Sequence, residues 1–130
     1  MKGYFLNIEE ETLKNIDYRR VLFTANNSQL VLMSIEPGDE IGNEVHTLDQ
    51  FIRIEQGKAE VNIDGEKTNA GADWAFIIPA GAEHNVSNIG VEPLKLYSIY
   101  SPPEHKHGTV HKTKADEKEE HFDGETSIEN

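Results

Sequence analysis

Short apolar segments alternate with turn residues along most of the chain, and a helical period of apolar residues is nearly absent. Groups of turn residues recur about every 8–12 positions, which is typical of an all-β sandwich or barrel. The apolar segments predict strands at residues 18–24, 29–35, 44–46, 50–55, 59–63, 66–69, 74–78, 84–88 and 94–100. Between two of them, Asp64-Gly65 is a typical two-residue hairpin turn. The pattern therefore predicts an all-β fold built from antiparallel hairpins.

The two ends of the chain differ in pattern from its middle. Residues 1–17 fit either a short helix or an edge strand, and we expect this N-terminal extension to pack on a barrel formed by residues 18–101. Two prolines end the last predicted strand, and residues 102–130 form a polar tail that is rich in histidine and then acidic. Because hydrophobicity is low and charge is high from Asp116 onward, we expect this tail to be partly flexible, with a frayed helix or disorder at its end.

Composition narrows the classes of function. The chain has 130 residues, the size of one domain, and its 24 Asp and Glu against 12 Lys and Arg give a net charge of −12. This charge repels nucleic acids and anionic membrane surfaces. The chain has no cysteine, which excludes thiolate zinc sites and cysteine nucleophiles. It also lacks an apolar run of the ~18 residues that a membrane helix needs, and the apolar segment of a secretory signal. We therefore expect a cytoplasmic protein without nucleic-acid or membrane partners.

Four side chains form a candidate metal site. Glu44 and His46 share one face of a predicted strand, because side chains alternate between the two faces. Gln50 shares its face with the apolar residues of the next strand, so its amide is expected at the same end of the interior. A second imidazole, His84, follows a tight turn on another strand. Two imidazoles, one carboxylate and one amide favour one divalent first-row transition metal, namely Mn, Fe, Co, Ni or Zn.

Two motifs in this region resemble those of the cupins. The first runs Gly38, five residues, Glu44-x-His46, three residues, Gln50, six residues, Gly57, where the usual cupin form has His-x-His and Glu. The second runs Pro79-x-Gly81, two residues, His84, three residues, Asn88, preceded by Gly71 and Asp73. The resemblance covers Tyr18 to Ser101 and implies a double-stranded β-helix barrel of jelly-roll type. The chain most resembles short single-domain bacterial proteins grouped with mannose-6-phosphate isomerase-like cupins, a statement about fold that supplies no substrate.

Carried over residue by residue, the family's metal ligands fall on Glu44, His46, Gln50 and His84. The first ligand histidine of the usual motif is replaced by Glu44, and its glutamate is replaced by Gln50. One carboxylate is thereby gained and one is lost, so the total charge of the ligands is unchanged. The resemblance therefore still implies a metal site, with the amide as its weakest donor.

The leading hypothesis is a metal-dependent enzyme of isomerase or epimerase type that acts on a small polar, sugar-like molecule in the barrel mouth. A metal that polarises a carbonyl acidifies the neighbouring C–H bond, and Glu44 or a tail histidine would be the base. The first alternative is an iron-dependent dioxygenase, and the second is a non-catalytic cupin that binds or senses a small ligand. We also expect a homodimer, from the resemblance and from apolar strands that a small barrel cannot cover alone.

The tail adds three further histidines, His105, His107 and His111. They could form a second metal site, remain in a flexible tail that binds metals weakly, or cross to a partner subunit and close its barrel mouth. Tyr97 and Tyr100 end the last predicted strand and are expected to pack rather than to contact substrate. Trp74 is likewise expected to pack within the sandwich or at a dimer contact.

Overall fold

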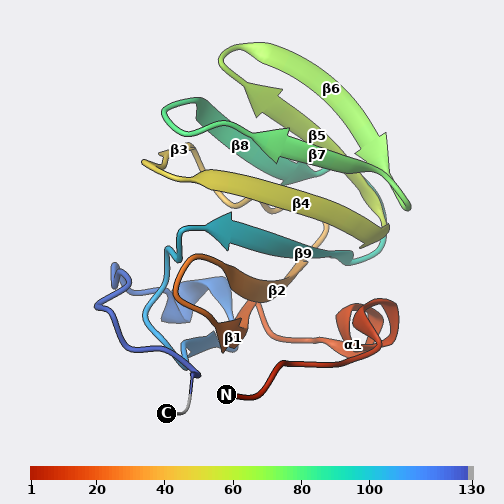
Figure 1. Ribbon diagram of the computed structural model, residues 1–130. Helices are drawn as coiled ribbons and strands as arrows, with labels where there is room; N and C mark the ends of the chain where they lie inside the picture. The colour runs from red at the N-terminus through yellow and green to blue at the C-terminus, as the bar shows by residue number, and fades with distance from the viewer. Residues whose placement is uncertain (129–130) are drawn as a thin grey trace.

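The computed structural model describes residues 1–128 and consists mainly of antiparallel strands (Figure 1). The strands are β1 (Arg19–Thr24), β2 (Gln29–Ile35), β3 (Glu44–Val45), β4 (Asp49–Gln56), β5 (Lys58–Ile63), β6 (Glu66–Gly71), β7 (Ala75–Ile78), β8 (Glu83–Asn88), β9 (Leu94–Ser101) and β10 (Val110–His111). An α-helix, α1 (Ile8–Lys14), precedes them, and a 3₁₀ helix, η1 (Lys114–Asp116), follows them. The all-β prediction is confirmed, with β3 and β7 slightly shorter than expected.

Two sheets face each other around one core. The larger sheet has the strand order β10-β1-β2-β9-β4-β7, and the smaller has the order β3-β8-β5-β6. The inward-facing apolar side chains of both sheets form one buried cluster. The larger sheet supplies mostly large members of this cluster, which include Val31, Met33, Ile35, Ile52, Ile54, Ile78, Leu94 and Leu96. The smaller sheet supplies Ala59, Val61, Ala70 and Val86.

The inward-facing side chains become polar at one end of the larger sheet. Thr24, Gln29, Tyr100 and Gln50 pair in register across strands β1, β2, β9 and β4, and all four are buried. We call these four residues the polar row. Buried amides and hydroxyls need hydrogen-bond partners, so this row marks the end of the interior at which specific polar contacts are made.

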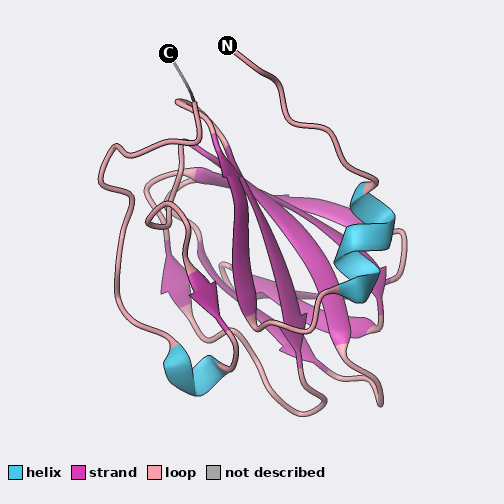
Figure 2. Cartoon of the chain, turned by 90° about the horizontal axis from the view of Figure 1, so that it is seen from below, coloured by secondary structure: helices cyan, strands magenta, loops and turns pink. Residues whose placement is uncertain are grey.

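The N-terminal extension contains a short helix rather than the edge strand that its sequence also allowed. Asn7 caps α1, and its side-chain oxygen accepts a hydrogen bond of 3.1 Å from the backbone of Glu10. After the helix, Lys95 of β9 donates to the carbonyl oxygens of Leu13 and Asn15, at 3.0 and 2.7 Å. Figure 2 shows α1 and the C-terminal segment on opposite sides of the strands, whereas Asp17, at the end of the extension, lies 3.7 Å from Lys112 of that segment.

The C-terminal segment, residues 102–128, returns to the edge of the larger sheet. Strand β10 pairs with β1, and the backbones of Ser127 and Thr24 are joined by a hydrogen bond of 2.8 Å. An isolated bridge links His105 to His121. The segment thereby lies along β1, from Arg19 and Arg20 at one end to Thr24 of the polar row at the other. The last two residues of the predicted tail, 129 and 130, lie outside the described residues.

Within residues 1–128, neither helix is long and apolar enough to cross a membrane.

Candidate metal centre

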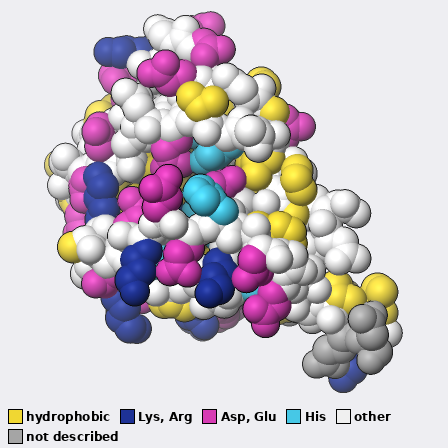
Figure 3. Space-filling model, turned by 90° about the vertical axis from the view of Figure 1, so that its left-hand side faces the viewer, with side chains coloured by type: hydrophobic (Ala, Val, Ile, Leu, Met, Phe, Trp, Pro, Cys, Tyr) yellow, Lys and Arg dark blue, Asp and Glu magenta, His cyan; other side chains and the backbone are white. Residues whose placement is uncertain are grey.

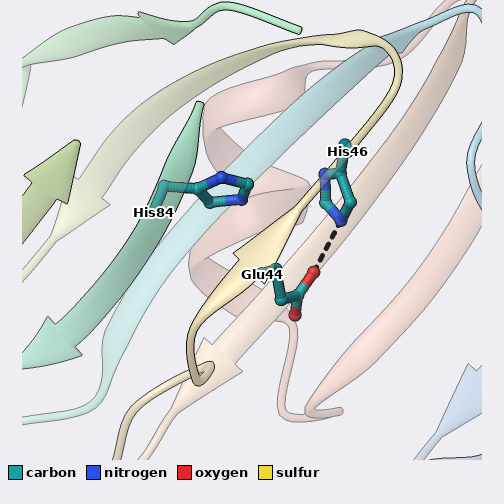
Figure 4. A group of neighbouring side chains, drawn as sticks. All are labelled: Glu44, His46 and His84. Carbon is teal, nitrogen blue, oxygen red and sulfur yellow. Dashed lines mark hydrogen bonds and ion pairs between the residues drawn. The ribbon is translucent and has the colours of Figure 1, made fainter. Parts of the chain in front are cut away.

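Two strands of the smaller sheet bring three candidate ligands together. Glu44 of β3 lies directly opposite His84 of β8 in the antiparallel ladder, and His46 follows β3 immediately. The backbone N–H of Gly81 donates to the carbonyl of His46 at 2.8 Å, which fixes the chain at this turn. One ligand atom from each of Glu44, His46 and His84 lies within 4.8 Å of the other two, and their side chains converge (Figure 4).

Glu44 and His46 form a close ion pair. The carboxylate Oε2 lies 2.6 Å from the imidazole Nε2, and the side chains are 30% and 10% exposed. Burial by itself would raise the pKa of Glu44, but the hydrogen bond and charge of His46 outweigh it and hold that pKa below its usual value. Burial lowers the pKa of His46, but the hydrogen bond and charge of Glu44 outweigh it and raise that pKa. The carboxylate is therefore ionised and aimed at the imidazole.

His84 is held in the tautomer that a metal requires. Its Nδ1 lies 2.9 Å from the carbonyl oxygen of Ala82, and a carbonyl can only accept, so Nδ1 carries the hydrogen. The lone pair of the neutral ring is then on Nε2, which points toward Glu44 and His46 in Figure 4. A backbone carbonyl that orients a histidine in this way is a frequent second contact of metal-ligating imidazoles.

Gln50 approaches from the larger sheet, as its position among inward-facing residues predicted. Its side chain is 3% exposed, and its Nε2 donates to Ser98 Oγ at 3.1 Å and to Tyr100 Oη at 3.2 Å. The amide oxygen Oε1 is buried without a hydrogen-bond partner, as is Nδ1 of His46. A buried carbonyl oxygen without a donor is unusual. The amide of Gln50 lies near enough to His46 to add to the effect of Glu44 in raising the pKa of that imidazole, so the imidazole or a cation would satisfy this oxygen. The role of Gln50 as a ligand remains a prediction.

The donor set fits a first-row transition metal. Nitrogen and oxygen ligands lie about 2.0–2.2 Å from such an ion, so two ligand atoms are at most about 4.4 Å apart. The three candidate atoms lie within 4.8 Å of one another, so small side-chain rotations would bring them into range. Two imidazoles and one carboxylate leave further coordination positions for the amide of Gln50, water or a substrate oxygen.

A pocket of about 510 Å³ opens beside these residues. One wall is formed by Glu44, Val45 and His46, and the remainder by Arg19 and by the C-terminal segment, including His105 and residues 117–121. Figure 3 views the side on which β3 lies and shows histidine side chains in the middle of that face among acidic ones. The C-terminal segment thus covers the pocket of its own chain.

The second metal site considered for the tail histidines is not formed. Within the described residues, only Glu44, His46 and His84 form a group of three that could hold an ion. His105 lines the pocket beside Glu44, whereas His107 and His111 line a separate pocket of about 640 Å³. The three histidines are separated because the bridge from His105 to His121 and the β1–β10 pairing hold different parts of the tail.

Sequence reasoning missed Arg19, which joins the barrel to the C-terminal segment. Arg19 is 3% exposed. Its guanidinium Nη1 donates to Glu117 Oε2 at 2.7 Å and lies 3.3 Å from Nδ1 of His111. Its Nε is buried without a partner. The available signal was strand alternation, which places Arg19 on the same face as the apolar Val21 while Arg20 faces outward, and a buried charge requires a partner elsewhere in the chain.

Comparisons with known proteins agree with this geometry. The profile of the family described as "Cupin domain" matches residues 31–100. The uncharacterized protein YrkC of Bacillus subtilis is 47% identical over 122 residues, an alignment that spans 88% of this chain and 66% of the relative. The chain thus covers about two thirds of the length of that curated relative.

Solved structures support the same assignment of the fold. The crystal structure of BH2720 from Bacillus halodurans superposes with a TM-score of 0.87 at 48% identity, covering 88% of this chain and 92% of that one. An RmlC-like cupin from Shewanella frigidimarina, at 23% identity, superposes with a TM-score of 0.60 over 65% of this chain and 74% of that one. The predicted jelly-roll fold is thereby confirmed.

Proposed function

The chain belongs to the cupin family, and from this premise and the geometry of the site we propose that it is a metal-dependent enzyme acting on a small polar, sugar-like molecule. The observation that carries the proposal is the orientation of His84. Its Nδ1 is occupied by the carbonyl of Ala82, so its Nε2 faces the carboxylate of Glu44 and the imidazole of His46. The rings of His46 and His84 also pack edge to face, with centroids 4.9 Å apart, but packing alone does not require Nε2 of His84 to face a carboxylate, and that orientation suits a cation.

The proposed ligands are Glu44, His46, Gln50 and His84, around one divalent ion of Mn, Fe, Co, Ni or Zn. Such an ion, when bound, acts as a Lewis acid on a carbonyl or hydroxyl oxygen. The lone pair on Nε2 of His84 and the unpartnered Oε1 of Gln50 support these two assignments. The pocket of about 510 Å³ is large enough for a small sugar-like molecule beside the ligands.

The proposed reaction is isomerisation or epimerisation, with Glu44 as the catalytic base. One carboxylate oxygen of Glu44 faces His46, and the other points away from it (Figure 4). The second oxygen accepts the proton from the carbon next to the substrate carbonyl, and the electron pair of that C–H bond moves into the carbonyl group. The same oxygen then returns the proton to the substrate. The lowered pKa of Glu44 keeps the carboxylate ionised and able to accept a proton, while the same lowering makes it a weak base that depends on a metal to acidify the C–H bond.

The first test is elemental analysis of untagged protein purified without chelators. We expect about one equivalent of a first-row metal per chain in the wild type, and its loss in Glu44→Ala and His84→Ala. His107→Ala is the matched control, because His107 lines a different pocket and should retain the metal. Retention of the metal in both site variants would overturn the proposed ligand set.

The second test separates the reaction classes. The metal-loaded protein is incubated with hydroxycarbonyl compounds in D₂O, and deuterium entering the carbon next to the carbonyl is followed by NMR. Exchange that disappears in Glu44→Gln supports the isomerase proposal. Iron together with oxygen uptake would favour a dioxygenase, and ligand retained without chemical change would favour a binding or sensing module.

We also propose a homodimer, formed through the outward face of the larger sheet. On that face Phe51 lies opposite both Ile77 and Ile99, and Ile77 is 62% exposed. The nearby Trp74, which was expected to pack within the sandwich or at a dimer contact, is 53% exposed in one chain, which supports the second of these. Light scattering is expected to give twice the 14.6 kDa of one chain, and a single-chain mass after Ile77→Lys. A wild-type protein of single-chain mass would refute this proposal.

A further inference from the structure

His105 occupies a position in the metal-site pocket that the folding of the C-terminal segment does not explain. It lines the same pocket as Glu44 and His46. Its ring stands edge-on to Tyr100, with centroids 5.0 Å apart, and Tyr100 is in turn 5.9 Å from the ring of His46. The histidine thus extends the wall that begins at the candidate ligands, although it is 59 positions beyond His46 in the chain.

The backbone of His105 is held by a buried side chain of the barrel. Oε1 of Gln29 accepts the N–H of His105 at 3.0 Å, and Nε2 of Gln29 donates to its carbonyl at 2.8 Å. Gln29 is 1% exposed, and Thr24 accepts a further hydrogen bond of 3.0 Å from its Nε2. One amide thereby makes both hydrogen bonds that a neighbouring strand would make. The polar row of the sheet therefore fixes where the His105 ring lies.

The other side of the segment is held as well. The carbonyl of Glu104 accepts the N–H of Phe122 at 2.8 Å, and its carboxylate lies 3.0 Å from Nδ1 of His121. His105 itself bridges to His121. The backbone of His105 is therefore held from both sides by contacts that any residue could make, and the ring adds its edge-on contact with Tyr100.

The ring of His105 has an unused hydrogen-bonding atom. Its Nε2 is buried and has no partner. Burial, and next the charge of Arg19, lower the pKa of His105 to about 2, so the imidazole is neutral and a poor proton acceptor near neutral pH. It also lies outside the group of Glu44, His46 and His84 that could share an ion. Because Nε2 is buried while His105 lines the pocket, a rotation of the ring toward the pocket would bring this atom to a bound molecule.

The charges around the pocket indicate what kind of molecule would be bound. Two cationic side chains line it, Arg19 and Lys118, against five carboxylates: Glu44, Glu104, Glu117, Glu119 and Glu120. Arg19 is already paired with Glu117 at 2.7 Å. With the two charges of the proposed divalent ion added, five carboxylates still leave a net negative charge, which disfavours anionic sugar acids and phosphates relative to uncharged molecules that offer several oxygens.

We propose that His105 is a substrate-contact residue of the metal site, whose Nε2 hydrogen-bonds an oxygen of an uncharged hydroxycarbonyl molecule in the pocket. This proposal rests on the proposed function and adds to it the residue that the C-terminal segment contributes. The C-terminal segment is then part of the binding site of its own chain. Gln29 of the polar row positions His105 through its two hydrogen bonds to the His105 backbone.

The test uses full-length protein loaded with Co²⁺ and titrated with 1,3-dihydroxyacetone, a small uncharged hydroxycarbonyl compound. The visible spectrum of Co²⁺ reports both metal loading and the arrival of an oxygen ligand. Wild-type protein is compared with His105→Phe and His105→Ala, and with His107→Phe as the matched control from the same segment. We expect unchanged Co²⁺ stoichiometry in all four proteins. The dissociation constant for dihydroxyacetone should rise about tenfold in both His105 variants only, the effect of one lost hydrogen bond.

Each other outcome is decisive. An unchanged dissociation constant in the His105 variants overturns the contact, while the metal site stands. Loss of Co²⁺ in both variants overturns it too, because His105 would then be a metal ligand or a structural support. Wild-type protein that binds Co²⁺ but shows no response to dihydroxyacetone also refutes the contact. A wild type that binds no metal refutes the proposed function itself, and the contact with it.

Discussion

The amide of Gln50 donates a hydrogen bond to the phenol oxygen of Tyr100, 3.2 Å away, and the two residues are direct partners in strands β4 and β9. Tyr100 is in turn the register partner of Gln29, whose amide holds the backbone of His105. One row of the larger sheet therefore orients a candidate metal ligand and also holds the segment that covers the pocket. A change in Tyr100 should therefore alter metal affinity at the candidate site while the fold is retained.

Replacement of Tyr100 by Phe tests this link. The variant removes one of the two acceptors of the Gln50 amide and leaves Ser98 at 3.1 Å, so the amide is held less firmly. We expect a loss of about 1 kcal/mol in the free energy of unfolding, and a fall in metal affinity of up to about tenfold. Competition with a chromophoric chelator measures the affinity. Tyr97→Phe, on the outward face of β9, should leave it unchanged, and equal affinities in both variants would contradict the link.

Replacement of Gln50 by Glu restores the acid that usually occupies this position in cupins. A carboxylate is a stronger donor to a divalent cation than an amide, so we expect metal affinity to rise by about tenfold or more. Without metal, a second buried carboxylate near Glu44 is repelled, so the chelated variant should melt below the chelated wild type. Calorimetric melting with and without metal measures both effects.

The control for this change is Gln56→Glu on the same strand. Gln56 donates to the carbonyl of Pro93 at 2.9 Å, outside the metal site, so its replacement should not strengthen metal binding. If Gln50→Glu leaves the affinity at the wild-type value, the oxygen of Gln50 does not bind the ion.

Gly57 tests the packing of the turn between β4 and β5. Its φ is +97°, and a Cβ there would lie 3.1 Å from Cα of Leu94 and 3.3 Å from the carbonyl oxygen of Pro93. Gly57→Ala is therefore expected to cost about 1–3 kcal/mol for the backbone conformation, and more for the contact with backbone atoms. Gly65→Ala is the matched control, because its φ is +86° but nothing lies within 4 Å of its Cβ. Urea unfolding should find Gly57→Ala the less stable of the two, and the reverse order would contradict the packing argument.

The fold and the positions of the candidate ligands could be predicted because their signals are local. Glu44 and His46 are two residues apart on one strand face, and Gln50 alternates with buried Ile52 and Ile54, so the period of the strand places all three. The contacts of the C-terminal segment are not local. Arg19 meets Glu117 across 98 positions, and Gln29 meets His105 across 76. No period links such pairs, and a polar segment held by hydrogen bonds resembles a disordered one in composition.

Trp74 illustrates a second limit of the pattern. Its size and its place at the start of a predicted strand favoured packing within the sandwich or at a dimer contact, yet it precedes β7 and is 53% exposed in one chain, which fits only the second. Whether an aromatic residue at the edge of a sheet is covered depends on which elements reach that edge. Here α1 packs near β4 and β9, and the C-terminal segment lies at β1, on the opposite side of the strands. The composition of the chain does not determine this arrangement.

The pH dependence of stability tests whether the His105 ring is buried in solution. Burial lowers its pKa to about 2, whereas an imidazole in the unfolded chain titrates near 6.5. Between these values the unfolded chain binds one proton more than the folded chain, so the free energy of unfolding falls as the pH falls through 6.5. His111, whose pKa burial also lowers, acts in the same direction. The pKa of His46 is raised, so this residue makes the free energy of unfolding rise as the pH falls. His46 is present in the wild type and in the tail variants, so its contribution cancels when they are compared.

The contribution of His105 to the pH dependence of the free energy of unfolding is isolated by comparing wild-type protein with His105→Phe in the presence of a chelator. For one imidazole shifted this far, the destabilisation at about pH 5.5 relative to about pH 7.5 is about 1.4 kcal/mol. Urea unfolding at the two pH values should therefore show a smaller loss of stability in His105→Phe than in the wild type, by about that amount. His107→Phe should lose as much as the wild type. Identical losses in the wild type and His105→Phe would mean that the ring titrates in contact with water, in which case the C-terminal segment does not hold it in the pocket.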